Sequence, residues 1–331
     1  MFSIRMLISG AAALAVLTAA GAAANAASDC SLKQVTAIPA DLKYGAVIET
    51  KINGTSARLA VDTASSVSGL HKAFAQRIGL PIENSYTAVY ADSNARNLNL
   101  MTHVKRLELG TAVSENEALV LSDQSGDGTD GNTVGGFAAD YLSNYDLEID
   151  PSANKIVLWS QDHCAGKVVY WENEYFATPL LFRHSASQRR PELDVTIDGK
   201  TLHAMLWTGA RSTVIRQAVV ESKLGWVVGT DGTPKSGTWH DGNNHELDRY
   251  KHTVQSFSFG DVTLHNVDVS IEPMDMAAHV KDIGSNFSAL NTEQPDIYIG
   301  MDILRKFHLY LAYGESKLYY TIAKPKQATS Q

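Results

Sequence analysis

The two halves of this chain begin with the same pattern, and this repetition limits the possible folds more than any other feature. In the first half, strand-like residues 44–53 meet an Asn53-Gly54 turn and continue as a second apolar strand, 56–61. In the second half, residues 192–197 meet an Asp198-Gly199 turn, and 201–206 follow. Such turns are typical of β-hairpins. Each hairpin ends eight residues after its turn glycine, at Asp62 and at Trp207, so the spacing indicates an internal duplication.

The similarity continues beyond the hairpins. A turn of small residues follows each hairpin, and we expect helices at 70–80 and 215–226, ending near Gly79 and Gly225 because glycine is favoured just after a helix. Each half also closes alike. The segments 138–142 and 300–304 precede pairs of strands, which we predict at 145–149, 155–159, 307–312 and 317–320.

A strand that ends in Asp-Thr-small-small-Ser, with a later apolar-Gly-x-Asp-apolar-Leu segment and a closing hairpin, resembles the retropepsin-like aspartic proteases. The resemblance covers residues 44–159 and 192–321, so the chain is similar to a fused, two-lobed version of the retroviral-type protease dimer. It implies an all-β fold of two lobes with few short helices and a peptide cleft between them. The domain expectation is a signal peptide at 1–26, lobes at 27–160 and 191–323, a linker at 161–190 and a polar tail at 324–331.

The resemblance places the first catalytic carboxylate at Asp62, with Thr63 as the hydroxyl that fixes the turn and Ala64 where the family usually has glycine. Such a site needs two carboxylates that share one proton, since two like charges a few Å apart cannot both ionise. The second copy keeps Thr208 and Gly209 but has Trp207 in place of the second acid. An indole only donates a hydrogen bond and does not titrate near neutrality. We therefore expect weak or absent proteolysis.

The sequence gives weaker support for a different second catalytic acid or for another class of hydrolase. The resemblance assigns Asp140 and Asp302 to structure, away from the cleft. Pairing of two chains through Asp62 would supply a second acid, but a tandem copy in the same chain competes more effectively, so a monomer is favoured over a homodimer. Motifs of serine, zinc-helix and thiol hydrolases are missing from the sequence. We expect no cofactor.

Two polar loops could hold ions. The segment 239–248 collects metal-capable side chains, yet it is equally a solvated hairpin tip equivalent to the flap of the resembling family. The segment Asp123–Asp130 resembles half of a calcium loop, but Val134 stands where the bidentate glutamate is needed, which favours a flexible acidic loop. We therefore predict no metal site. Tyr90 and Trp239 are candidates for covering a peptide in the cleft, or alternatively for ordinary strand packing.

The N-terminal residues and the cysteines indicate an exported protein. Arg5 precedes an apolar run that ends in small residues at 24–26, which is typical of a secretory signal peptide cleaved after Ala26, and we expect a periplasmic or secreted protein with no later membrane span. In that compartment Cys30 and Cys164 are expected to form one disulfide, although two unpaired thiols remain the alternative. The formal net charge of −8 argues against a nucleic-acid partner.

Three functions remain open. The first is an exported aspartic endopeptidase that uses Asp62 and an unidentified second acid. The second is a pseudoprotease that binds an extended peptide or protein segment in the cleft by strand addition, with Trp207 as an apolar anchor. The third is a structural module of the cell envelope without a ligand.

Overall fold

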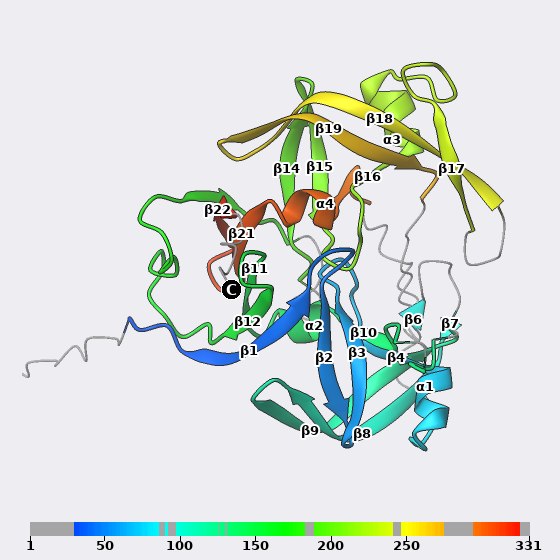
Figure 1. Cartoon of the computed structure of the whole chain (residues 1–331), viewed down its shortest axis with the longest axis vertical. Coiled ribbons are helices and arrows are strands. Elements are labelled where there is room, and N and C mark those ends of the chain that lie inside the picture. Colours follow the sequence, from blue (N-terminus) through cyan, green and yellow to red (C-terminus); the bar gives the residue numbers. More distant parts are fainter. Residues whose placement is uncertain are drawn as a thin grey trace, which may run out of the picture.

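The protein consists of two β lobes joined by a central sheet (Figure 1). The computed structural model describes residues 30–85, 90–91, 97–124, 126–129, 131–182, 189–240, 246–274 and 294–324. Most of the described elements are strands, and the helices are short. The predicted all-β, two-lobed fold class is therefore confirmed.

The first lobe is a sheet that closes on itself, at the bottom of Figure 1. Its strands follow the order β2-β3-β10-β4-β9-β8, and β2 also pairs with β8. The short β5 lies at the edge of this sheet beside β8, and β6 and β7 pair separately. The bounds are β2 Val47–Ile52, β3 Thr55–Val61, β4 Gly69–His71, β5 Glu83–Asn84, β6 Tyr90–Ala91, β7 Asn97–Leu98, β8 Leu100–Leu109, β9 Ala112–Ser122 and β10 Gly135–Phe137.

The second lobe repeats this topology at the top of Figure 1. Its order is β14-β15-β20-β16-β19-β18, with β14 also paired to β18, and β17 added at the edge. In both lobes the short strand before the small helix, β10 or β20, runs parallel to the end of the first hairpin. The bounds are β14 Glu192–Ile197, β15 Lys200–Leu206, β16 Val214–Arg216, β17 Lys235–His240, β18 Glu246–Phe259, β19 Val262–Glu272 and β20 Ile297–Ile299.

The central sheet takes strands from both halves of the chain. Its order is β13-β22-β21-β11-β12-β1, and the end of β1 continues into the first lobe by pairing with β2. Strand β13 lies inside the segment 161–190 that we expected to be a connection, and it pairs with β22. The bounds are β1 Gln34–Asp41, β11 Asp146–Asp150, β12 Lys155–Trp159, β13 Phe176–Pro179, β21 Phe307–Ala312 and β22 Lys317–Ile322.

The hairpin turns have the backbone that their sequences predict. Asn53 and Gly54 have φ of 49° and 83°, and Asp198 and Gly199 have φ of 46° and 79°. Two residues with positive φ define the turn that matches the twist of paired strands, and glycine and asparagine adopt them most readily. The duplication predicted from the spacing of these turns is therefore visible in the backbone of both lobes.

The helices are shorter than predicted. Residues 70–71 belong to β4 and 215–216 to β16, because both segments pair with neighbouring strands of their sheets. The helices that follow are α1 Lys72–Arg77, and α3 Gln217–Val219 continued by the π-helix η1 Val220–Leu224. Gly79 and Gly225 do have positive φ after them, as expected. The helices α2 Ala139–Leu142 and α4 Met301–Leu304 follow β10 and β20.

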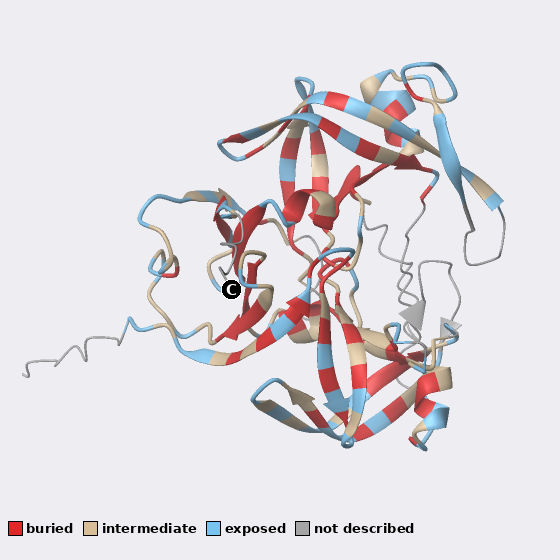
Figure 2. Ribbon diagram, viewed as in Figure 1, coloured by how far each residue is buried: buried red, intermediate tan, exposed pale blue. Residues whose placement is uncertain are grey.

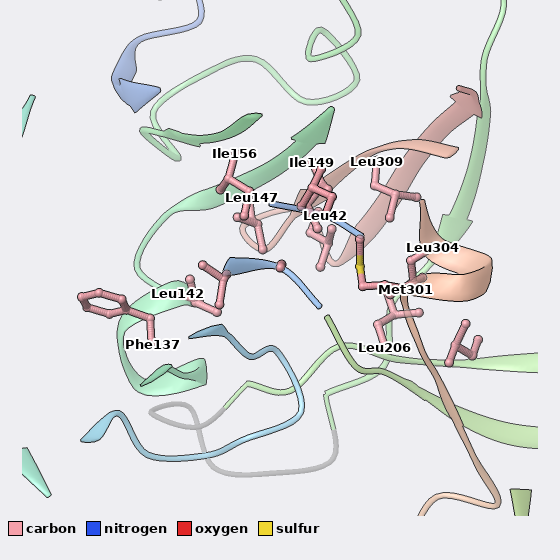
Figure 3. Close-up of a cluster of buried hydrophobic side chains, with 14 of the residues drawn as sticks. Leu42, Phe137, Leu142, Leu147, Ile149, Ile156, Leu206, Met301, Leu304 and Leu309 are labelled. Carbon is pink, nitrogen blue, oxygen red and sulfur yellow. The ribbon is translucent and has the colours of Figure 1, made fainter. Parts of the chain in front are cut away.

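The apolar core runs through all three parts. Figure 2 shows buried and exposed residues alternating along the hairpins of both lobes, whereas β11 and β21 are buried throughout. This difference arises because the central sheet is covered by other parts of the chain. Figure 3 shows one stretch of the core that passes from Phe137 and Leu142 through Leu147 and Ile149 to Leu304.

The predicted disulfide is present. Cys30 and Cys164 are bonded, with their Cα atoms 4.9 Å apart, and the bond links the segment before β1 to the segment after β12. In the described ranges, no helix combines the length and the apolar character needed to cross a membrane.

Candidate active site

Asp62 and Trp207 occupy equivalent places in the two lobes. Each follows the last residue of a hairpin, β3 or β15. The Asp62 backbone N–H donates to the Phe137 carbonyl at 2.8 Å, and the Trp207 N–H donates to the Ile299 carbonyl at 2.9 Å. The alignment of the two halves that we inferred from spacing is therefore matched by the backbone hydrogen bonds.

The two threonines hold the turns of the two lobes together. The Thr63 hydroxyl donates to the Leu206 carbonyl and the Thr208 hydroxyl to the Val61 carbonyl, both at 2.5 Å. Each backbone N–H also donates to the hydroxyl of the other threonine, at 3.1 and 3.2 Å. Both side chains are buried. This reciprocal network brings Asp62 and Trp207 to one point between the lobes.

The Asp62 carboxylate accepts hydrogen bonds from both lobes. Within its own turn it accepts from the Ala64 and Ser65 N–H groups at 3.0 and 3.1 Å and from the Ser65 hydroxyl at 2.8 Å. The Trp207 indole N–H of the second lobe donates to its Oδ2 at 3.3 Å. Burial raises the pKa of Asp62, and the hydrogen bonds of Ser65, Ala64 and Trp207 oppose that rise without cancelling it.

Trp207 lies in an apolar cluster that includes residues of both lobes. The ring packs on Tyr298 with centroids 5.6 Å apart and planes at 66°, and Met205 and Ala64 complete the cluster. In the first lobe, the residues equivalent to Met205 and Tyr298 are Ala60 and Gly136, by the register of β3 with β10 and of β15 with β20. The second lobe therefore has larger side chains where an indole must be supported.

The residues that follow the two threonines, Ala64 and Gly209, differ because each faces a different side chain of the opposite lobe. A Cβ atom at Gly209 would lie 2.8 Å from both Cγ and Oδ2 of Asp62, which leaves no room for a side chain. Ala64 stands at the equivalent place in the first lobe and packs in the Trp207 cluster. Alanine at position 64, where the family usually has glycine, therefore occurs together with tryptophan at position 207, where the family has the second acid.

Asp140 and Asp302 have matching structural roles. Asp140 accepts from the Ser68 N–H and hydroxyl, and Asp302 accepts from the Thr213 N–H and hydroxyl. In each lobe the carboxylate thus ties the small helix to the turn that follows the hairpin. These contacts agree with the structural role expected for both residues.

Sequence reasoning missed Arg190, which lies beside the candidate site. Its guanidinium donates to the Ala64 carbonyl at 3.4 Å and interacts electrostatically with Asp62 and Glu192. It belongs to the segment 161–190 that we treated as a linker. The sequence contains no spacing that connects it to Asp62, because the approach depends on how the two lobes meet.

The flap candidates are described only through their backbones. Tyr90 lies in β6 opposite Leu98, and Trp239 lies in β17 opposite Leu247. Residues 241–245 of the possible metal loop, and Ser125 and Asp130 of the calcium-like loop, lie outside the described residues. In the described part of that second loop, the Asp127 carboxylate accepts from the N–H and hydroxyl of Thr129.

One group of metal-capable residues lies in the central sheet. Glu148, Asp150 and His308 are buried, and their potential ligand atoms lie within 4.8 Å of one another. The Glu148 carboxylate, however, already accepts from the Trp159 indole at 2.7 Å and from the Tyr170 hydroxyl, and it lies 2.9 Å from His308 Nε2. Hydrogen bonding within the protein is therefore sufficient to account for this cluster.

Comparisons with known proteins match each half of the chain to a model of aspartyl proteases. The model for gag-polyprotein putative aspartyl protease matches residues 48–129, and the model for aspartyl protease matches residues 193–303. The chain belongs to the retropepsin-like aspartic protease family. Among solved structures, the aspartic proteinase from Irpex lacteus is similar at 15% identity, covering 89% of this chain and 99% of that chain with a TM-score of 0.49. No curated protein sequence matches significantly.

The contact between Trp207 and Asp62 should be visible in solution as a pH titration. Because the indole N–H donates to the carboxylate, protonation of Asp62 should shift the Trp207 indole resonance in a ¹H–¹⁵N NMR spectrum. Burial raises the Asp62 pKa, so the midpoint is expected above the usual range for an aspartic acid. The titration should vanish in Asp62→Asn. A resonance that is unaffected by pH in the wild type would contradict the contact.

Proposed function

We propose that this protein binds an extended peptide segment between its lobes and does not cleave it at an appreciable rate. The observation that carries the proposal is the hydrogen bond from the Trp207 indole to Asp62 Oδ2. The family mechanism needs a second carboxylate at that place, and an indole can neither share a proton with Asp62 nor accept one from water.

The surroundings of Asp62 also favour an inactive site. Four donors already point at its two oxygens, one of them from the second lobe. A base that activates water must be free to accept a proton from it. Loss of one catalytic acid or base typically lowers a rate by about 10²–10⁴.

The edge of the sheet in the second lobe favours a peptide segment as the ligand. Strand β17 is the last strand in the order of its sheet, so its outer edge can pair with an added strand. The two turns would form the floor beneath such a strand. Asp62, Trp207 and Gly209 are partly accessible, and Ser65 and Arg211 are exposed. Main-chain hydrogen bonds would supply affinity, and Trp207 an apolar contact.

Export and a monomeric state belong to the same proposal. The predicted signal peptide at 1–26 lies outside the described residues, and the Cys30–Cys164 disulfide is compatible with an oxidising compartment. The threonine network already joins two lobes of one chain, so a second chain is not needed to complete the site. We therefore propose a periplasmic or secreted monomer.

Cleavage of peptides by Asp62 is the second candidate function. The observation that favours it is the pKa of Asp62, which burial of the carboxyl raises above its ordinary value. A carboxyl that is protonated up to a higher pH than an ordinary aspartic acid could serve as a general acid. This function would still require a base from outside the pair of turns.

Peptide binding can be tested with a pool of random peptides. The protein without residues 1–26 is mixed with the pool, and the peptides that coelute with it on size exclusion are identified by mass spectrometry. We expect a retained peptide to lose at least about tenfold in affinity when alternate backbone nitrogens are methylated, because strand addition uses those N–H groups. Methylation of the intervening nitrogens is the matched control and should weaken binding less. Retention of no peptide at all would refute the proposal.

A further inference from the structure

The first lobe contains a cavity that the candidate active site does not use. It has a volume of about 410 Å³ and is enclosed by the hairpin β2–β3, the hairpin β8–β9, helix α2 and strand β12. This volume falls within the range of about 300–1,000 Å³ that is usual for small-molecule sites. The apolar part of its wall includes Ile48, Leu107, Leu109, Ala112, Ile156 and Leu158.

The same space in the second lobe is filled by aromatic rings. The turns Gly110 and Gly260, both with positive φ, align the hairpins β8–β9 and β18–β19, so that Leu109 corresponds to Phe259. By the register of the two closing hairpins, Leu158 of the first lobe is the counterpart of Tyr320 of the second. Phe259 packs on Tyr320 and on Phe307 with centroids 4.9 Å apart in both cases. At two of these three positions the first lobe has a leucine, Leu109 or Leu158, and the smaller side chains leave the cavity open.

The polar part of the cavity wall is acidic. Glu117 and Asp140 both line it, together with Ser114, Tyr141 and Asn144, and no lysine or arginine is among the lining residues. Asp140 is engaged by Ser68, whereas the partners of Glu117 are the neutral hydroxyls of Ser114 and Tyr141. The residue at the place of Glu117 in the second lobe is Val267, by the alignment of Asn116 with Asn266. At this position the first lobe, which contains the cavity, has a charged side chain, and the second lobe has an apolar one.

We propose that this cavity binds a small amphipathic molecule with an apolar body and a protonated amine at one end. The apolar body would occupy the space that Phe259 and Tyr320 fill in the second lobe. The amine would meet the Glu117 carboxylate, whose charge no basic residue of the wall offsets. Val61 and Phe137 both line the cavity. Val61 precedes Asp62 in the chain, and the Phe137 carbonyl accepts from the Asp62 N–H, so the cavity adjoins the candidate active site.

Binding can be measured with N-phenyl-1-naphthylamine, a dye whose fluorescence rises in apolar surroundings. We expect saturable binding to the full chain, displacement by decylamine, and displacement by decanoate at concentrations at least about tenfold higher, because the carboxylate of decanoate would face Glu117. Glu117→Gln should remove most of this difference. Equal competition by the two ligands in the wild type would overturn the charge assignment.

Filled-cavity variants locate the site. Leu109→Phe introduces the ring that the second lobe has at that position and is expected to reduce dye binding at least about tenfold. Ala112→Val, which copies Val262, is a second and smaller filling in case the first variant does not fold. Thr263→Val, at the second-lobe hairpin, is the matched control and should leave binding unchanged. Dye binding that survives both fillings, or that is absent from the wild type, would refute the proposal. Neither result bears on peptide binding.

Discussion

Replacement of Trp207 by aspartate is expected to raise peptidase activity at acidic pH at least about 100-fold above the wild type. The variant restores a carboxylate opposite Asp62, and the threonine network already holds the two turns at the required place. Two such carboxylates share one proton, so the activity should fall as the pH rises and both ionise. The size of the gain is the lower end of what a catalytic acid or base typically contributes, about 10²–10⁴.

Two variants distinguish the effect of the added carboxylate from the effect of removing the indole. Trp207→Asn has nearly the shape of the aspartate variant without its charge and should stay inactive. The double variant Asp62→Asn with Trp207→Asp should also be inactive, because only one carboxylate remains. Initial rates of cleavage of a peptide pool, measured by mass spectrometry, give the comparison. Equal rates for Trp207→Asp and Trp207→Asn would show that something other than the indole blocks catalysis.

Thr63→Val is expected to destabilise the protein by about 3 kcal/mol. Valine has the shape of threonine but leaves the buried Leu206 carbonyl and Thr208 N–H without the hydroxyl that satisfies them. Each unsatisfied buried group costs about 1–3 kcal/mol. The effect should appear as a lower midpoint in urea-induced unfolding.

Thr63→Ser is the matched control, because serine keeps the hydroxyl and loses only a methyl group. We expect it to retain most of the stability that Thr63→Val loses. Destabilisation by the serine variant as large as that of the valine variant would mean that packing of the methyl group, and not the network between the lobes, stabilises this region.

The sequence predicts those parts of the fold that local patterns specify. The Asn53-Gly54 and Asp198-Gly199 turns fix the hairpins, and the equal distances to Asp62 and Trp207 align the two lobes. The pairing of the two cysteines follows from their number and the expected compartment. Each of these inferences depends on residues close together in the chain or on a simple count.

The pairing of strands that are far apart in the chain could not be predicted from the sequence. Strands β1 and β13 at the edges of the central sheet pair with residues more than a hundred positions away, and no local pattern marks them. Residues 70–71 and 215–216 begin the segments that we predicted to be helical, but pairing with neighbouring strands makes them β. The approach of Arg190 to Asp62 depends on the packing of the lobes, as does the contact of Trp207 with Asp62.

The most direct test is to incubate the wild-type protein and Asp62→Asn with a diverse peptide pool from pH 3 to pH 8 and to analyse the products by mass spectrometry. We predict that both proteins leave the pool uncleaved at every pH while the wild type retains bound peptides. Cleavage by the wild type that disappears in Asp62→Asn would establish an active acid protease and contradict the proposal that Trp207 has made the site a binding site.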